Sequence, residues 1–337
     1  MQYVYGPVLS RRLGQSLGVD PVPFKTCNWN CVYCQLGRTS PPVAERQYFV
    51  PVDDVVADVA RVLQQPTPPA IDWITFAGSG EPTLHAGLGQ ILRDLKALTP
   101  LPIAVITNGS LLYRADVRDE LRVADAVMPS VDAGSERLYR QITRPVQSLD
   151  FDEFIAGIVA FREQYRGQLW VEVMLVQGLN DSAAALRDLA QVLRRIRPDA
   201  IHLNSPVRPP CEPWVQPVDE AGLARAQELL GTAATVVSPA AGRYQLAAGD
   251  DILEAILAAI ARHPTREQEL IEALRPRDLA EIEEALADLA RSGRAQLVER
   301  DGHRFWSGAE ARYVAERLAR CQNRSPPERT RAAPPSP

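Results

Sequence analysis

Strand-like and helix-like segments alternate from about residue 17 to residue 237, and this alternation constrains the fold more than any other feature of the chain. The strand-like segments are short, rich in Val, Ile and Leu, and bounded by Gly, Asn or Pro. They comprise residues 16–19, 71–76, 103–107, 126–131, 169–176 and 200–204. Such alternation predicts right-handed strand–helix–strand units around parallel strands. Six units are too few to close an eightfold barrel. We therefore predict an α/β fold, a partial (β/α)6 TIM-like barrel.

The segments between these strands carry the start signals of amphipathic helices. Pro51, with Asp53 in the first turn, precedes a run of valines at helical spacing. Asp150 and Glu153 resemble a capping box, and Asp181 precedes another apolar helical face.

Three of the five cysteines stand within eight residues, in the segment Cys27-Asn28-Trp29-Asn30-Cys31-Val32-Tyr33-Cys34. This C-x₃-C-x₂-C spacing can hold three irons of a 4Fe–4S cube and leave the fourth iron without a protein ligand. An open position on a metal is where a substrate or cofactor binds. The segment therefore predicts a 4Fe–4S cluster with one accessible iron.

Three other uses of the cysteines fit the sequence less well. A zinc site usually takes four ligands in pairs, and only the isolated Cys211 and Cys321 remain. A plant-type ferredoxin uses C-x₄-C-x₂-C and a fourth cysteine. A disulfide framework needs an even count and an oxidising compartment.

The composition limits the class of protein and its partners. The 337 residues have room for one large domain and one small one, and the net charge of −5 argues against a broad nucleic-acid surface. We recognise no signal peptide and no apolar run of the ~20 residues that span a membrane. We therefore expect a cytoplasmic protein with no membrane partner.

Glycines and polar side chains follow successive predicted strands, where parallel strands end at one edge and where such barrels carry their chemistry. The residues concerned are Gly80 and Glu81 after the second strand, Asn108 after the third, Ser130 and Asp132 at the end of the fourth, Asn180 after the fifth and Asn204 at the end of the sixth. A glycine-rich turn lets the backbone approach a ligand closely, and a carboxylate there can accept from an ammonium group.

The cysteine motif, with Tyr33 directly before Cys34, resembles that of the radical S-adenosylmethionine (SAM) superfamily. The resemblance implies that Cys27, Cys31 and Cys34 ligate the cluster and that SAM chelates the open iron. It further implies that Tyr33, Gly80, Glu81, Asn108, Ser130, Asp132, Asn180 and Asn204 contact SAM. An external one-electron donor of the flavodoxin or ferredoxin type would reduce the cluster. SAM would then break to a 5′-deoxyadenosyl radical that abstracts hydrogen from a substrate.

Residues 3–220 resemble a narrower group, the Fe–S oxidoreductases related to the tRNA wyosine synthases. The flanks of the cysteine motif carry this resemblance, which suggests RNA modification by an oxidoreductase or transferase whose reaction is unknown. Wyosine synthases have further cysteines upstream of the triad, whereas none precedes Cys27 here.

Four further residues are candidate substrate contacts. Arg11 and Arg12 could bind an anionic group or be a solvated basic pair. Arg208 and Trp214 lie in the loop after the sixth strand, near the expected barrel mouth. Cys211 in the same loop could donate a hydrogen atom, ligate a second cluster, or have no special role.

The chain changes character after Gly249. Three helical patterns and a hairpin on Asp301-Gly302 predict a small winged-helix-like module. Over Gly249–Trp306 we count 13 acidic and 8 basic residues, so we expect no DNA binding. The predicted domains are a radical SAM core (1–240), the module (249–307) and a disordered tail (320–337). Two other functions stay open: a radical enzyme acting on a peptide or protein, and a non-catalytic Fe–S or zinc regulator.

Overall fold

The computed structural model describes residues 3–10, 12–67, 69–237, 251–275 and 277–314. Its main feature is an eight-stranded sheet whose strands lie side by side in sequence order. The strands are β1 (Val4–Ser10), β2 (Gly14–Val19), β3 (Trp73–Phe76), β4 (Ile103–Thr107), β5 (Ala126–Pro129), β6 (Gln168–Met174), β7 (Ala200–Asn204) and β8 (Ala234–Val236). β1 pairs antiparallel with β2, and every pairing from β2 to β8 is parallel.

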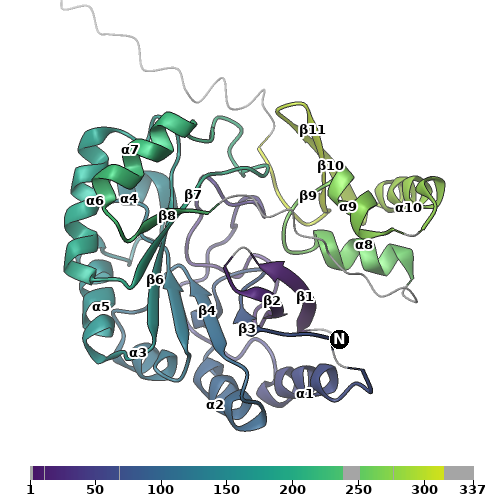
Figure 1. Ribbon diagram of the computed structural model, residues 1–337, viewed down its shortest axis with the longest axis horizontal. Coiled ribbons are helices and arrows are strands. Elements are labelled where there is room, and N and C mark those ends of the chain that lie inside the picture. Colours follow the sequence, from purple (N-terminus) through teal and green to yellow (C-terminus); the bar gives the residue numbers. More distant parts are fainter. Residues whose placement is uncertain (1–2, 11, 68, 238–250, 276, 315–337) are drawn as a thin grey trace, which may run out of the picture.

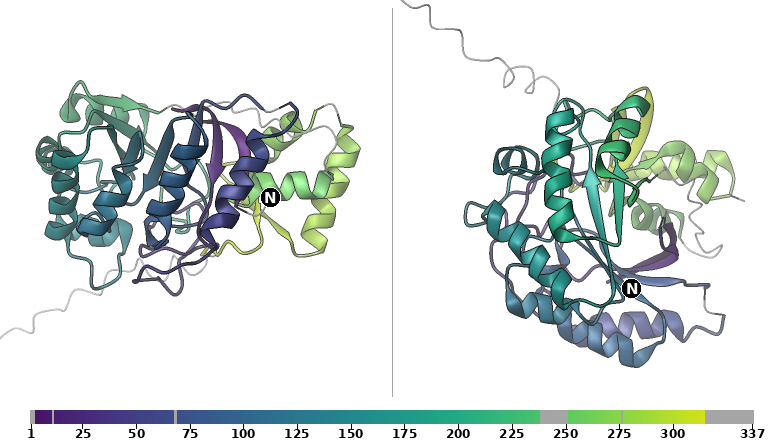
Figure 2. Two further views of the ribbon diagram at one scale, coloured as in Figure 1. Left: turned by 90° about the horizontal axis from the view of Figure 1, so that it is seen from below. Right: turned by 60° about the vertical axis from the view of Figure 1, so that its left-hand side comes forward.

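Helices connect the parallel strands and cover one face of the sheet (Figures 1 and 2). They are α1 (Val52–Leu63), α2 (Leu88–Leu98), α3 (Ala115–Leu121), α4 (Glu136–Thr143), α5 (Phe151–Gln164), α6 (Ala183–Ile196) and α7 (Glu220–Leu230). The predicted α/β fold with a partial TIM-like barrel is confirmed. β1 and the three-residue β8 extend the sheet beyond the six predicted strands.

Local signals fix where the helices begin. The Asp150 carboxylate accepts from the backbone N–H groups of Asp152 and Glu153 at 2.8 and 3.0 Å and so caps α5. The cap of α6 is Ser182, whose hydroxyl accepts from Ala185 N. Asp181 instead accepts from Gly178 N and holds the preceding turn.

The two faces of the sheet differ in polarity, as β6 illustrates. Leu169, Val171 and Val173 are fully buried in the large core between sheet and helices. The alternate residues Trp170 and Glu172 are half-buried on the opposite, inner face. A small apolar cluster of Leu13, Ala104, Ala126 and Met128 packs on that inner side. The inner face is therefore the place where polar side chains can meet a ligand.

The segment after residue 250 has its own hydrophobic core. It contains α8 (Ile252–Ile260), β9 (Thr265–Arg266), α9 (Glu267–Ala273), α10 (Leu279–Arg291), β10 (Ala295–Arg300) and β11 (His303–Gly308). The strands form an antiparallel sheet in the order β10-β11-β9. These helices and the hairpin lie where the sequence predicts them, and the description of the segment as winged-helix-like stays a prediction. We call residues 251–308 the C-terminal module. The predicted disordered tail, residues 320–337, lies outside the described residues.

The C-terminal module contacts the barrel at several points. Arg262 lies over the Tyr5 ring, 4.2 Å from its centroid, and forms an ion pair with Asp20 at 3.1 Å. Arg300 donates to the carbonyl of Val215 at 2.7 Å. No helix in the described part of the chain is long and apolar enough to span a membrane.

Candidate functional site

The three clustered cysteines lie in the loop that follows β2. This loop, residues 20–50, is held in place by backbone hydrogen bonds to the end of α4: Asn30 N donates to Thr143 O and Val32 N to Ile142 O, both at 2.9 Å. Trp29 is 1% exposed and packs edge-to-face on Tyr139. These contacts with α4 therefore hold the backbone of the cysteine loop in place.

The thiols have N–H donors close by. Lys25 Nζ lies 3.0 Å from Cys34 Sγ, and Trp29 N lies 3.4 Å from Cys27 Sγ. Asn108 Nδ2 lies 3.7 Å from Cys27 Sγ. Such donors stabilise negative charge on sulfur and tune the potential of a cluster.

Burial disfavours ionised thiols in the metal-free protein. It raises the pKa of Cys27 to about 12, and the Glu81 carboxylate adds to this rise. Burial and the two neighbouring cysteines raise the pKa of Cys31 well above its ordinary value. Because metal ligands are thiolates, iron binding here must release protons.

The donor set fits a cluster better than a single ion. No group of three or more His, Cys, Asp or Glu side chains within the described ranges is arranged to hold one metal ion. A cube distributes three thiolates over three irons, so its ligands need not converge on one centre. A structural zinc ion needs four converging ligands. Three free thiols on one fixed loop therefore suit a 4Fe–4S cube.

Gly80 and Glu81 lie in the turn after β3, against the cysteine loop. A Cβ on Gly80 would lie 2.1 Å from the carbonyl oxygen of Thr26, so only glycine fits this close approach. The Glu81 carboxylate is 2% exposed. Its Oε1 accepts from Thr83 N, Thr83 Oγ1 and Thr107 Oγ1, and its Oε2 accepts from Asn108 N at 2.6 Å. Glu81 therefore ties the ends of β3 and β4 together and keeps one Oε2 lone pair for a further donor.

Asn108 connects this turn to the cysteine loop. Its Nδ2 donates to Asn28 Oδ1 at 2.7 Å, and its Oδ1 accepts from Ser110 N at 2.9 Å. Asn28 in turn donates to Ser110 Oγ at 2.8 Å and is fully buried. Asn108 is thus engaged with the cysteine loop.

Tyr33 and Asp132 meet across the strand ends. The Tyr33 hydroxyl donates to Asp132 Oδ2 at 2.6 Å, and Met174 N donates to Oδ1 at 2.7 Å. Burial raises the pKa of Asp132 to about 6, although both hydrogen bonds oppose this. Ser130, two residues earlier, pairs with Glu172 in an isolated bridge. The segment after β5 therefore places Asp132 against Tyr33 of the cysteine loop, with Ser130 two residues before it.

Asn180 and Asn204 differ in how they are held. Asn180 Nδ2 donates to the carbonyls of Asp132 and Met174, and Oδ1 accepts from Val176 N, so the side chain supports the loop after β6. Asn204 lies on the inner face at the end of β7, and its Nδ2 lies 3.4 Å from Glu172 Oε1. Asn204 is therefore the more available of the two for a ligand.

An ion pair on the inner face was missed by sequence reasoning. Arg12 forms it with Glu172, and the two side chains are only 18% and 15% exposed, so Arg12 is not a solvated residue. Burial and the Arg12 charge lower the pKa of His202 to about 4, so its imidazole is neutral at physiological pH. The only sequence signal was an acidic residue within an apolar strand. Arg11 lies outside the described residues.

The loop after β7 packs directly on the cysteine loop. Cys211 Sγ lies 3.1 Å from the carbonyl oxygen of Cys31 and 3.3 Å from that of Val32. Arg208 is close to Gln35, with 3.5 Å between Nη1 and Oε1, and Trp214 packs against the barrel core. The loop is thus placed beside the cysteine triad, and its contact with a substrate stays a prediction.

Two further carboxylates hold the site together. Glu212 is 1% exposed and pairs with both Arg38, at 2.7 Å, and Arg144. Asp20 Oδ2 accepts from Ser79 N and Ser79 Oγ at 3.0 and 2.6 Å, besides its pairing with Arg262. Arg262 therefore links the C-terminal module to the turn that carries Gly80 and Glu81.

The chain is similar to several known proteins. A family model described as the radical SAM superfamily matches residues 22–190. A UPF0026 protein of Methanocaldococcus jannaschii is 33% identical over 313 residues, 91% of this chain and 96% of that protein. A GTPase Obg of Brachyspira hyodysenteriae is 41% identical over 205 residues, which are 61% of this chain and 30% of that protein. Among solved structures, a radical SAM methyltransferase from Sphaerobacter thermophilus has a TM-score of 0.49 and 20% identity, covering 66% of this chain and 65% of that one.

The chain belongs to the radical SAM superfamily. Members of this superfamily are enzymes that typically bind a 4Fe–4S cluster and SAM.

Proposed function

We propose that this protein is a radical SAM enzyme in which Cys27, Cys31 and Cys34 hold a 4Fe–4S cluster with one open iron. The observation that supports this most directly is the fixed loop with three free thiols, set against the ends of β3, β4 and β5. When bound, the cluster and SAM supply a 5′-deoxyadenosyl radical that abstracts hydrogen from the substrate.

The residues of the chain have separate tasks in this proposal. Glu81 holds the strand ends and offers its remaining Oε2 lone pair to the ammonium group of SAM. Ser130 and Asp132 face the rest of the cofactor from the segment after β5. Lys25 places a positive charge beside Cys34, which favours electron uptake at the cluster. Contacts within the protein hold these side chains in position, and a cofactor bound among positioned groups is protected from side reactions with water.

Anaerobic reconstitution tests this proposal. The protein with iron, sulfide, SAM and dithionite should form 5′-deoxyadenosine, and the Cys27→Ala variant should form none. Iron analysis should give about four irons per chain for the parent protein. A protein that stays colourless and forms no 5′-deoxyadenosine would reject the assignment.

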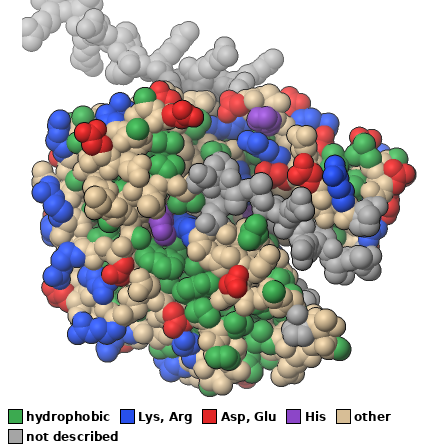
Figure 3. All heavy atoms as spheres, in the orientation of Figure 1, with side chains coloured by type: hydrophobic (Ala, Val, Ile, Leu, Met, Phe, Trp, Pro, Cys, Tyr) green, Lys and Arg blue, Asp and Glu red, His purple; other side chains and the backbone are tan. Residues whose placement is uncertain are grey.

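Two substrate classes remain, RNA and a polypeptide, and the charge of the C-terminal module favours the polypeptide. Acidic side chains gather at its outer edge, over α10 (Figure 3). Phosphate groups would be repelled there. We accordingly expect the full chain to bind neither duplex DNA nor RNA at nanomolar concentration in moderate salt, as measured by fluorescence anisotropy. Salt-sensitive nanomolar binding would favour RNA.

A further inference from the structure

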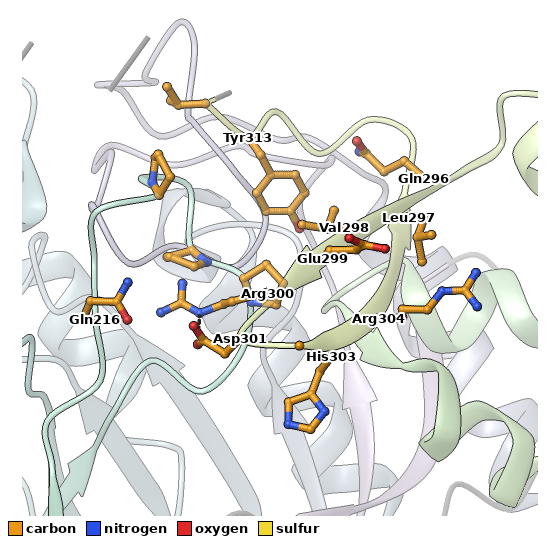
Figure 4. Close-up of a pocket in the computed structure, with 15 residues that line it drawn as sticks. Gln216, Gln296, Leu297, Val298, Glu299, Arg300, Asp301, His303, Arg304 and Tyr313 are labelled. Carbon is orange, nitrogen blue, oxygen red and sulfur yellow. Dashed lines mark hydrogen bonds and ion pairs between the residues drawn. The ribbon is translucent and has the colours of Figure 1, made fainter. Parts of the chain in front are cut away.

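A groove of about 700 Å³ lies between the β10–β11 hairpin and the loop after β7. One wall is β10 and the start of β11 (Figure 4). The other wall carries three prolines, Pro209, Pro210 and Pro213, and Tyr313 and Val314 also line the groove. The groove therefore lies between the C-terminal module and the loop that begins at the end of β7.

The groove contains the open edge of a sheet. β10 is the outer strand in the order β10-β11-β9. Asp301 and Gly302, with φ of 49° and 75°, form the two-residue turn that follows it, and Arg300 pairs with His303. In such a hairpin the residues flanking the turn share hydrogen bonds, and every second residue points its backbone groups outward. Leu297 and Glu299 therefore present their N–H and C=O groups to the groove.

The opposite wall leaves this edge free. Proline has no N–H group and cannot donate to a strand. Within the described ranges no strand pairs with the outer side of β10. Leu297 on this edge strand is 38% exposed, so an apolar side chain is available to a second chain that pairs there. Backbone donors and acceptors at strand spacing match those of an extended polypeptide.

Charge limits which polypeptide fits. Arg304 already pairs with Glu267, and Arg300 with Asp301 and the Val215 carbonyl. Glu299 is exposed and has no ion pair among the described residues. With 13 acidic and 8 basic residues over 249–306, the surroundings favour a neutral or basic occupant.

The groove also lies next to the cysteine loop. Cys211, between Pro210 and Pro213 in the groove wall, contacts the backbone carbonyl of Cys31. Tyr313 lines the groove and donates to the carbonyl of Gln35, the residue after Cys34. A chain bound along β10 therefore lies close to the loop at which the radical would form.

We propose that β10 binds an extended, neutral or basic segment of a polypeptide substrate as an added strand, with a basic side chain near Glu299. This inference rests on the proposed hydrogen-abstracting function and names its substrate class. The bound strand would hold the substrate at the rim of the barrel while a neighbouring part of the same chain enters it.

The test uses the full-length, reconstituted protein and a display library of random peptides about twelve residues long, which is enough to pair with β10. Selected peptides are synthesised and their affinity measured under argon. Leu297→Pro removes the backbone N–H group of residue 297, which points away from β11, and leaves the hydrogen bonds between β10 and β11 intact. Leu297→Ala is the matched control, because it shortens the side chain and keeps this N–H group. We expect the proline variant to lose at least about tenfold in affinity and the alanine variant to bind nearly as the parent does. Glu299→Lys should weaken the basic peptides.

A second measurement does not depend on the variants folding. In this measurement the backbone nitrogens of a selected peptide are methylated one at a time. Binding should be lost when the methyl group is at every second residue and kept at the residues between, because only alternate N–H groups of the peptide face β10. Uncoupled 5′-deoxyadenosine formation should be unchanged in Leu297→Pro, so loss of peptide binding and loss of cofactor chemistry are separate results. The proposal fails if no peptide is selected, if methylation shows no period of two, or if single-stranded RNA displaces the peptides.

Discussion

Asp132→Asn should stabilise the metal-free protein at pH 8. Asp132 is 3% exposed and accepts from Tyr33 and from Met174 N. Burial nevertheless raises its pKa from 3.8 to about 6. The folded protein therefore binds a proton at Asp132 more tightly than the unfolded chain does. This tighter binding stabilises the folded state fully when the pH is below the pKa of Asp132 in the unfolded chain. The stabilisation is lost as the pH rises through the higher pKa of Asp132 in the folded state. The native state therefore becomes less stable between pH ~4 and ~6.

The magnitude follows from the size of the shift. The pKa of Asp132 rises from 3.8 to about 6, a difference of about two units. Each pKa unit corresponds to a free energy of about 1.4 kcal/mol, so the ionised form of Asp132 destabilises the native state by about 3 kcal/mol. Asparagine has the same shape, still accepts from Met174 N and stays neutral. It can donate to the Tyr33 oxygen, but it leaves the hydroxyl proton to find another acceptor, so we expect a net gain of ~1–3 kcal/mol above pH 7.

Urea denaturation followed by circular dichroism at pH 4 to 8 measures this difference. The free energies of unfolding of parent and variant should agree near pH 4 and separate as the pH rises. Asp53→Asn, at an exposed position of α1, is the control and should show no such separation. Parallel pH profiles, or a variant that is less stable at pH 8, would refute the reasoning. SAM affinity should fall in the same variant, since we propose that Asp132 faces the cofactor.

Three further perturbations test other contacts. Glu81→Gln should weaken SAM binding by ~1.5–3 kcal/mol, about ten- to a hundredfold, through the loss of a charge-assisted hydrogen bond; unchanged affinity in calorimetry under argon would exclude this role. Lys25→Met should lower the reduction potential of the cluster in an EPR-monitored titration, whereas a variant at the other lysine, Lys96→Met, should not; equal potentials would count against the contact. Arg262→Ala should cost about 3 kcal/mol of stability, because buried Asp20 loses its partner. Adding Asp20→Asn should recover part of that loss, and additive effects of the two changes would contradict the pairing.

The sequence predicted the parts of the site that follow from strand order. Parallel strands bring their carboxyl ends to one edge, so Glu81 after β3 and Asn108 after β4 could be expected to meet, and they do. Lys25 stands two residues before Cys27, but the sequence does not predict that its side chain contacts Cys34, nine residues further along the chain.

Contacts between distant segments could not be predicted in this way. Asp20 and Arg262 are separated by 242 residues and meet only because the C-terminal module packs beside β1 and β2. Glu172 on β6 and Arg12 in the turn between β1 and β2 meet on the inner face, and no sequence motif links the two segments. β8 was missed because three residues give too little periodicity to recognise.

The short segment after β11 has a consequence for how the protein is made. Arg312 accepts from Arg38 N through its carbonyl, and Val314 N donates to the Cys211 carbonyl. Together with Tyr313, these residues come last in the described part of the chain and are therefore synthesised after the rest of it. They nevertheless support the region directly after Cys34 through hydrogen bonds. On a nascent chain the cysteine loop cannot have its full set of supports until translation has passed residue 314. Iron–sulfur assembly factors that act during synthesis would therefore meet a more open loop than those that act on the released protein.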